Sequence, residues 1–200
     1  MSPNVWSKAI ANKEHFAEDV FTLLSKYKAR RDYVAGLRNT MSTGLSNNAS
    51  EAYFVLLKLA LAYTAVELLK DAIGGRFSVR DAGFAAELQK GTFDKMLASM
   101  EKNLAAKYDG GSGIRTRTYL KATDKNPDLI KFVADCRNLM FHGRFTPSET
   151  GLDKSSRRRA LLLGLANQTI AECDSGLNTW LEKQGAKLRN SKNKVGTVHG

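Results

Sequence analysis

An arginine and a histidine that can act together on a phosphate lie at the end of one amphipathic stretch, residues 135–143 (DCRNLMFHG). They are Arg137 and His142, and the other two histidines, His15 and His199, lie near the ends of the chain. A histidine with an ordinary pKa of about 6.5 accepts or donates a proton at neutral pH. An arginine offers a planar fork of donors to the charge that builds on phosphate oxygens. The pair therefore has the chemistry to cleave RNA through the RNA's own 2′-hydroxyl, without a metal ion.

Helical geometry assigns a role to each residue of this motif. Asn138 and His142 share a helix face, so the asparagine side chain can hydrogen-bond the imidazole and set its tautomer. Arg137 emerges about 140° away from His142 around the helix axis. Its long side chain reaches the same phosphate, or a second subunit completes the site. We assign His142 as general acid and base, Arg137 as phosphate clamp and Asn138 as the residue that orients the imidazole.

Each of these residues also has a purely structural interpretation. A histidine just before Gly143 is a common cap for the C-terminus of a helix. Arg137 can instead form an ion pair across the bundle, and Glu67 is a suitable partner. Glu67 can equally pair with Lys70 or with another arginine of the bundle. Under these interpretations the motif stabilises the fold and carries no chemistry.

The elements that position the motif are predicted to be helices. Apolar side chains recur with helical spacing, and prolines occur only at Pro3, Pro127 and Pro147. In the motif helix, Asn126 caps the N-terminus, Pro127 takes the first position and Gly143 ends the helix. We expect further helices over 13–41, 49–73, 79–89, 92–108 and from 155 or 156 to 181, and a short strand or extended loop over 114–120. The sum is an all-α bundle of roughly four to five main helices, with the very apolar second helix in the middle of the bundle or at a subunit interface.

The charge of the chain indicates its partner. The formal net charge of +11 favours a polyanion, with nucleic acid ahead of anionic lipid. Part of this excess lies from Lys183 onward, where no acidic residue occurs. We expect one helical domain over 1–184 and a basic, disordered tail over 185–200. The run of Arg157, Arg158 and Arg159 either forms a solvated first helical turn or lines an RNA channel, and its conflict with the helix dipole hints at the channel.

Several classes of protein are excluded by what the sequence lacks. It has no P-loop, no dinucleotide-binding glycine fingerprint and no cysteine–histidine cluster, so we expect neither a metal nor a cofactor. Cys136 and Cys173 are expected to be buried thiols in a reducing compartment. The N-terminus lacks the apolar core of a signal peptide, and the longest apolar run, 53–69, is interrupted by Lys58 and Glu67. We therefore expect a cytoplasmic protein that does not enter a membrane.

The pattern of Arg137, Asn138 and His142 resembles the R-x4-6-H motif of HEPN domains, in which a polar residue usually follows the arginine. The resemblance implies an all-α HEPN-like bundle that acts as a metal-independent endoribonuclease and leaves 2′,3′-cyclic phosphate ends. It also implies RNA as the substrate and a homodimer with a composite active site. The setting that it implies is a toxin, stress or anti-phage system, with an antitoxin or another protein as a further partner.

The specific match covers 137–143, and beyond it only the order of the helices is similar. Acidic residues on an early helix lie near some HEPN active sites, which makes Glu67 a candidate substrate-binding residue beside Arg144, Arg157 and Arg158. Arg144 stands where the HEPN partners of minimal nucleotidyltransferases often carry tyrosine, so the chain departs from that variant. The alternatives to an enzyme are a non-catalytic HEPN-like module that binds RNA, nucleotide or protein, and a basic helical scaffold.

Overall fold

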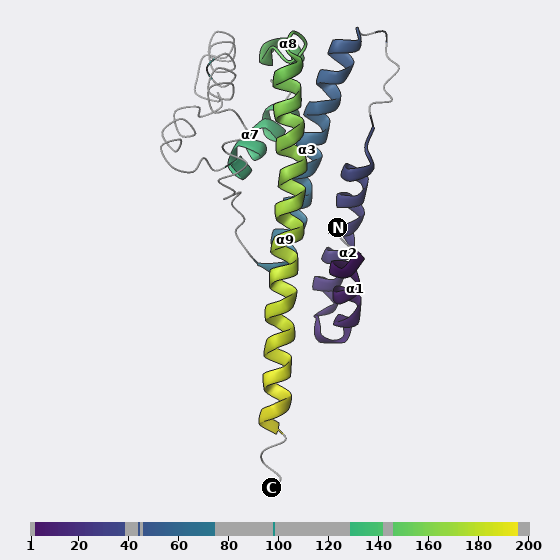
Figure 1. The fold of residues 1–200 in the computed structure, drawn as a ribbon, viewed down its shortest axis with the longest axis vertical. Helices are drawn as coiled ribbons and strands as arrows, with labels where there is room; N and C mark the ends of the chain where they lie inside the picture. Colours follow the sequence, from purple (N-terminus) through teal and green to yellow (C-terminus); the bar gives the residue numbers. More distant parts are fainter. Residues whose placement is uncertain are drawn as a thin grey trace.

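A computed structural model describes residues 3–38, 44, 46–74, 98, 129–141 and 146–195 (Figure 1). Its elements are α1 (Pro3–Ala11), the 3-10 turn η1 (Lys13–His15), α2 (Glu18–Gly36), α3 (Asn47–Ile73), α7 (Leu129–Phe141), α8 (Pro147–Thr150) and α9 (Ser156–Val195). The predicted all-α class is confirmed for this part of the chain, which contains no strand. The predicted segments 79–89 and 114–120 lie outside the described residues, as does 92–108 apart from Ala98.

Helix α3 lies at the centre of the bundle, as predicted, and packs against α2, α7 and α9. The hydroxyl of Ser46 caps its first turn by accepting from the amide of Ala49 at 3.3 Å. Gly74 ends it in the left-handed conformation with φ of 65°, and its amide donates to the carbonyl of Lys70. Apolar side chains cover most of the circumference of α3 because three helices bury it from different sides.

The length of α3 bears on the expectation about membranes. The interrupted run 53–69 is part of a longer helix that extends from Asn47 to Ile73. By length and composition alone, it is long and apolar enough to cross a membrane. More than half of its most apolar stretch is buried inside the bundle, which is the pattern of a core helix.

The beginning of the chain differs from the single helix predicted over 13–41. The chain forms α1 and η1 first, turns into an extended conformation at Phe16, and starts α2 at Glu18. Phe16 packs against Trp180 of α9 with ring centroids 5.3 Å apart, and Trp6 stacks on Phe21 at 6.0 Å. The break brings aromatic side chains into tertiary contacts that a continuous helix would not allow, because their directions along a helix are fixed.

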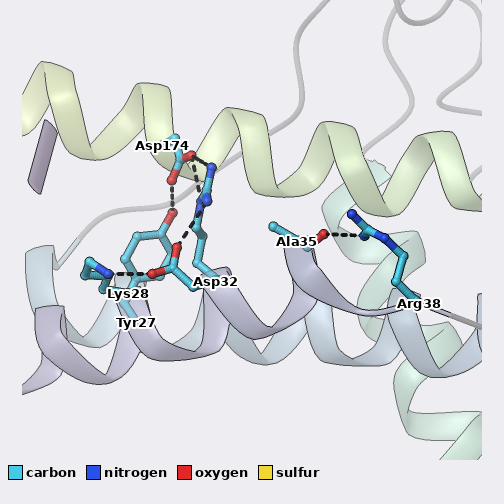
Figure 2. A network of polar contacts seen from close by, with 7 residues as sticks. Tyr27, Lys28, Asp32, Ala35, Arg38 and Asp174 are labelled. Carbon is cyan, nitrogen blue, oxygen red and sulfur yellow. Dashed lines mark hydrogen bonds and ion pairs between the residues drawn. The ribbon is translucent and has the colours of Figure 1, made fainter. Parts of the chain in front are cut away.

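A polar network joins α2 to α9 inside the bundle (Figure 2). The buried Tyr27 hydroxyl donates to a carboxylate oxygen of Asp174 at 2.7 Å, and Nε of Arg31 donates to the other oxygen at 3.0 Å. Arg31 also contacts Asp32 at 3.1 Å, and Asp32 accepts from Lys28 at 2.5 Å. Lys28 and Arg31 therefore pair with carboxylates, and the bonds of Tyr27 and Arg31 to Asp174 join the two helices.

Helix α9 begins where predicted but ends later. It starts at Ser156 and continues to Val195, past the expected end near Leu181 and into the predicted disordered tail over 185–200 (Figure 1). The structure thus corrects the tail prediction for residues 185–195. Alanine, leucine, lysine and arginine in this stretch favour helix, Gly185, Asn190, Ser191 and Asn193 are weaker helix formers, and no proline interrupts it.

The thiols of both cysteines are buried and unpaired, as predicted. Burial raises the pKa of Cys136 well above its usual value and, together with nearby Asp174, raises the pKa of Cys173 to about 12. The largest fully buried side chains of the core are Tyr27, Phe132, Leu24, Leu56, Leu59 and Leu69.

Candidate functional site

Helix α7 carries the motif and packs its apolar stripe against α3. The buried members of the stripe recur with helical spacing and are Phe132, Val133, Cys136 and Leu139. Arg137 follows a buried residue directly, so its side chain emerges at the edge of the contact between α7 and α3. The N-terminal cap predicted at Asn126 lies outside the described residues.

The guanidinium of Arg137 bonds to the side chains of two neighbours. Its Nη1 donates to Oδ1 of Asn138 at 2.8 Å, and its Nη2 lies 3.3 Å from Oε2 of Glu67 in α3. Its Nε is buried and has no hydrogen-bond partner in the described part of the chain. The side chain of Arg137 is 31% exposed and that of Glu67 41% exposed, so the pair lies at the surface. The ion pair that the sequence offered as a structural interpretation of Arg137 is therefore present.

Two aromatic rings lie beside the same guanidinium. The ring of Tyr63 in α3 is 6.0 Å from its central carbon, and the ring of Phe141 in α7 is 5.6 Å away. Both distances allow cation–π attraction. Phe141 is itself 59% exposed, which is unusual for a phenylalanine and leaves apolar surface directly beside the charged group. The N–H donors of the guanidinium are the groups that can bind an anion.

An open groove of about 460 Å³ adjoins the ion pair. Glu67 lines it together with residues of α2 and α3, which are Arg30, Thr64, Leu68, Lys70 and Asp71. The groove thus carries two cationic and two anionic side chains, and it shares Glu67 with the Arg137 cluster. Within the described residues, neither Arg30 nor Lys70 makes an ion pair.

The structure brings together three of the residues that the sequence singled out, namely Arg137, Asn138 and Glu67. His142 and Arg144 lie outside the described residues. Asn138 was assigned to orient His142, and in the structure its Oδ1 accepts a hydrogen bond from Arg137. The asparagine therefore helps to hold the guanidinium.

The arginine run at the start of α9 serves the local structure at two of its positions. Nη1 of Arg158 donates to the carbonyl of Thr150 at 3.0 Å. Arg159 donates to the carbonyl of Leu152 at 2.7 Å and pairs with Glu51 at 3.1 Å. These carbonyl and carboxylate contacts explain why cations occur at a helix N-terminus despite the dipole. The neighbouring Arg157 is exposed.

Tyr63 and Phe141 were not among the site residues predicted from the sequence. The sequence spacing places both rings on the helix faces of site residues. Phe141 lies four positions after Arg137, Tyr63 lies four positions before Glu67, and residues four apart share a helix face. Helical periodicity accounts for Tyr63 as an ordinary apolar residue, so only the packing of α7 on α3 identifies it as a neighbour of Arg137.

Comparisons of the chain with protein-family models, with curated proteins and with solved structures found no match. In the part of the chain that the structure describes, no group of three or more histidine, cysteine, aspartate or glutamate side chains is arranged to hold a metal ion. The Arg137 cluster and the sequence that follows it are therefore the features of this chain that point to a function.

Proposed function

We propose that this chain is a HEPN-like endoribonuclease that cleaves RNA without a metal ion, at a site formed by Arg137, Asn138 and His142. The observation that carries the proposal is the state of Arg137. Its guanidinium lies at the protein surface, five positions before the histidine in the chain, and its Nη atoms make only partly exposed contacts with Asn138 and Glu67. A surface guanidinium whose Nη contacts can exchange is suited to receive a phosphate oxygen.

The reaction needs one proton acceptor, one proton donor and a cation. His142 takes the proton of the 2′-hydroxyl, the 2′-oxygen attacks phosphorus, and the bond to the 5′-oxygen of the next nucleotide breaks. A protonated histidine gives a proton to that leaving oxygen. Arg137 stabilises the negative charge that builds on the non-bridging phosphate oxygens. The products are a 2′,3′-cyclic phosphate end and a free 5′-hydroxyl, and DNA is not a substrate because it lacks the nucleophile.

A homodimer fits this chemistry better than one subunit. Positions five apart in a regular helix differ by about 140° around its axis, so each group of the motif can serve a phosphate together with the motif of a second copy. The exposed Phe141 beside Arg137 supports the proposal, since a second copy would cover its apolar ring. We propose a cytoplasmic setting in a toxin, stress or anti-phage system, with an antitoxin or another protein as a further partner.

A cleavage assay tests the proposal directly. A labelled RNA is incubated in excess EDTA with wild type, His142→Ala, Arg137→Ala and Lys26→Ala, the last being an exposed α2 residue that removes one charge elsewhere. We expect cleavage with 2′,3′-cyclic phosphate ends by wild type and Lys26→Ala, and a loss of at least about 100-fold in the other two. Equal cleavage by all four proteins would indicate a contaminant or another site.

A non-catalytic HEPN-like module that binds RNA, nucleotide or protein is the second candidate. The ion pair of Arg137 with Glu67 favours it, because a guanidinium that already pairs with a carboxylate is partly committed to the contact between α7 and α3. This candidate predicts that the wild type binds RNA but leaves it intact, and that Arg137→Ala lowers affinity alone. A basic scaffold instead predicts that removal of residues after Gln184 abolishes binding while His142→Ala has no effect.

A further inference from the structure

We infer that Glu67 is an internal competitor for the anion site of Arg137, and that a bound phosphate displaces its carboxylate into the adjoining groove. This inference rests on the proposed function and adds a regulatory residue to it. It starts from the geometry of the Arg137–Glu67 contact, in which one carboxylate oxygen approaches one guanidinium nitrogen at 3.3 Å. The two parallel bonds of a strong arginine–carboxylate pair are absent from this contact.

The contact is therefore weak enough to exchange. Both side chains are partly exposed, and exposed ion pairs of this kind contribute little net stability because solvent screens them. The bond from Arg137 to Asn138 is also exposed. A phosphodiester brings two non-bridging oxygens and can engage Nη2 and Nη1 together in place of Glu67 and Asn138, whereas the Glu67 carboxylate contacts Nη2 alone.

The groove contains two cations that can bind the Glu67 carboxylate after it leaves Arg137. Lys70 lies three positions later on the same helix, and Arg30 of α2 lines the same groove. Because neither cation makes an ion pair among the described residues, either can accept the carboxylate when it leaves Arg137. The charge of Glu67 is thus compensated in both positions, so the exchange leaves no isolated ion.

The rings beside Arg137 keep this exchange local. Tyr63 and Phe141 flank the guanidinium at 6.0 and 5.6 Å and limit its movement, so the carboxylate is the group that moves. In the free protein, Glu67 then lowers affinity for any anion at Arg137. Ligands that bring one weakly placed charge are rejected, whereas a phosphate that engages both Nη atoms of Arg137 binds.

The test measures phosphate binding at Arg137 without requiring cleavage. The Nε–H resonance of Arg137 is followed by NMR while inorganic phosphate is added to wild type, Glu67→Gln and Asp71→Asn. Asp71 lines the same groove, so its substitution removes the same charge from the same place but does not touch Arg137. We expect Glu67→Gln to bind phosphate about two- to fivefold more tightly, the range set by a partly exposed ion pair, with less than half of that gain in Asp71→Asn.

Two results would overturn the inference. An equal gain in Glu67→Gln and Asp71→Asn would mean that Glu67 acts only through the general field of the groove. No gain in Glu67→Gln, including the case in which phosphate leaves the Arg137 resonance unchanged in every protein, would mean that Glu67 does not compete. The cleavage assay separates the competition by Glu67 from the proposed enzyme activity. If the wild type cleaves RNA and Glu67→Gln shows an unchanged phosphate affinity, only the competition by Glu67 is refuted. Tighter phosphate binding without any cleavage refutes the enzyme alone.

Discussion

Replacing Tyr27 by phenylalanine should destabilise the protein, because it removes one hydrogen bond from the network between α2 and α9. The Tyr27 hydroxyl is buried and donates at 2.7 Å to Asp174, whose side chain is only 16% exposed. A hydrogen bond to a charged group contributes about 1.5–3 kcal/mol. Arg31 still binds Asp174 in the variant, so the carboxylate keeps a partner and the loss should be near 2 kcal/mol.

Urea unfolding followed by circular dichroism measures this loss. For a chain of this size, the free energy of unfolding falls by about 2 kcal/mol per molar urea, so the midpoint should drop by about 1 M. Tyr33→Phe is the matched control, because Tyr33 lies on the same helix and is 56% exposed. The control should change stability by less than about 0.5 kcal/mol. Equal midpoints for the two variants would refute the view that the Tyr27–Asp174 bond holds these helices together.

Three further predictions concern the two buried thiols and two glycines. The pKa of Cys173 is raised from 9.0 to about 12, so the stability that its buried thiol contributes is present below pH 9 and is lost as the pH rises toward 12. The free energy of unfolding should therefore fall less steeply over this pH range in Cys173→Ala than in the wild type. Cys136 and Cys173 should not react with a thiol reagent until urea unfolds the chain, as a colorimetric thiol assay would show. Gly151→Ala should destabilise more than Gly74→Ala: both have φ of 65°, but a Cβ on Gly151 meets Nη1 of Arg158 at 2.6 Å and disturbs its bond to Thr150. A thermal melt that ranks the two glycine variants in the opposite order would contradict this account.

The helices that the sequence predicted well are those whose own residues determine them. Helix α3 was predicted to begin at Ala49, two positions after its start at Asn47, and its C-terminus agrees at Ile73, because a long apolar pattern ends at a glycine. The N-terminal helix was predicted less well. The helix is interrupted at Phe16, whose ring packs on Trp180. Because Trp180 is far away in the chain, no local sequence pattern predicts this interruption.

The candidate site was predictable to a similar degree. Charge and helical position sufficed to suggest that Arg137 pairs with Glu67, since each lies near the edge of an apolar stripe. The contribution of Tyr63 was hidden, because a tyrosine on a core helix has no pattern of its own that marks it as a neighbour of an arginine. The groove that Glu67 shares with Arg30 depends on how α2 lies beside α3, which is tertiary information.

The central position of α3 restricts how the chain can change over many generations. A helix with one solvent face tolerates polar substitutions there, but α3 is buried by α2, α7 and α9 and has few such positions. Substitutions that alter side-chain volume in its interior would disturb several contacts at once. We therefore expect descendants of this chain to differ least along α3, and to accumulate most of their differences on the outward faces of α2 and α9.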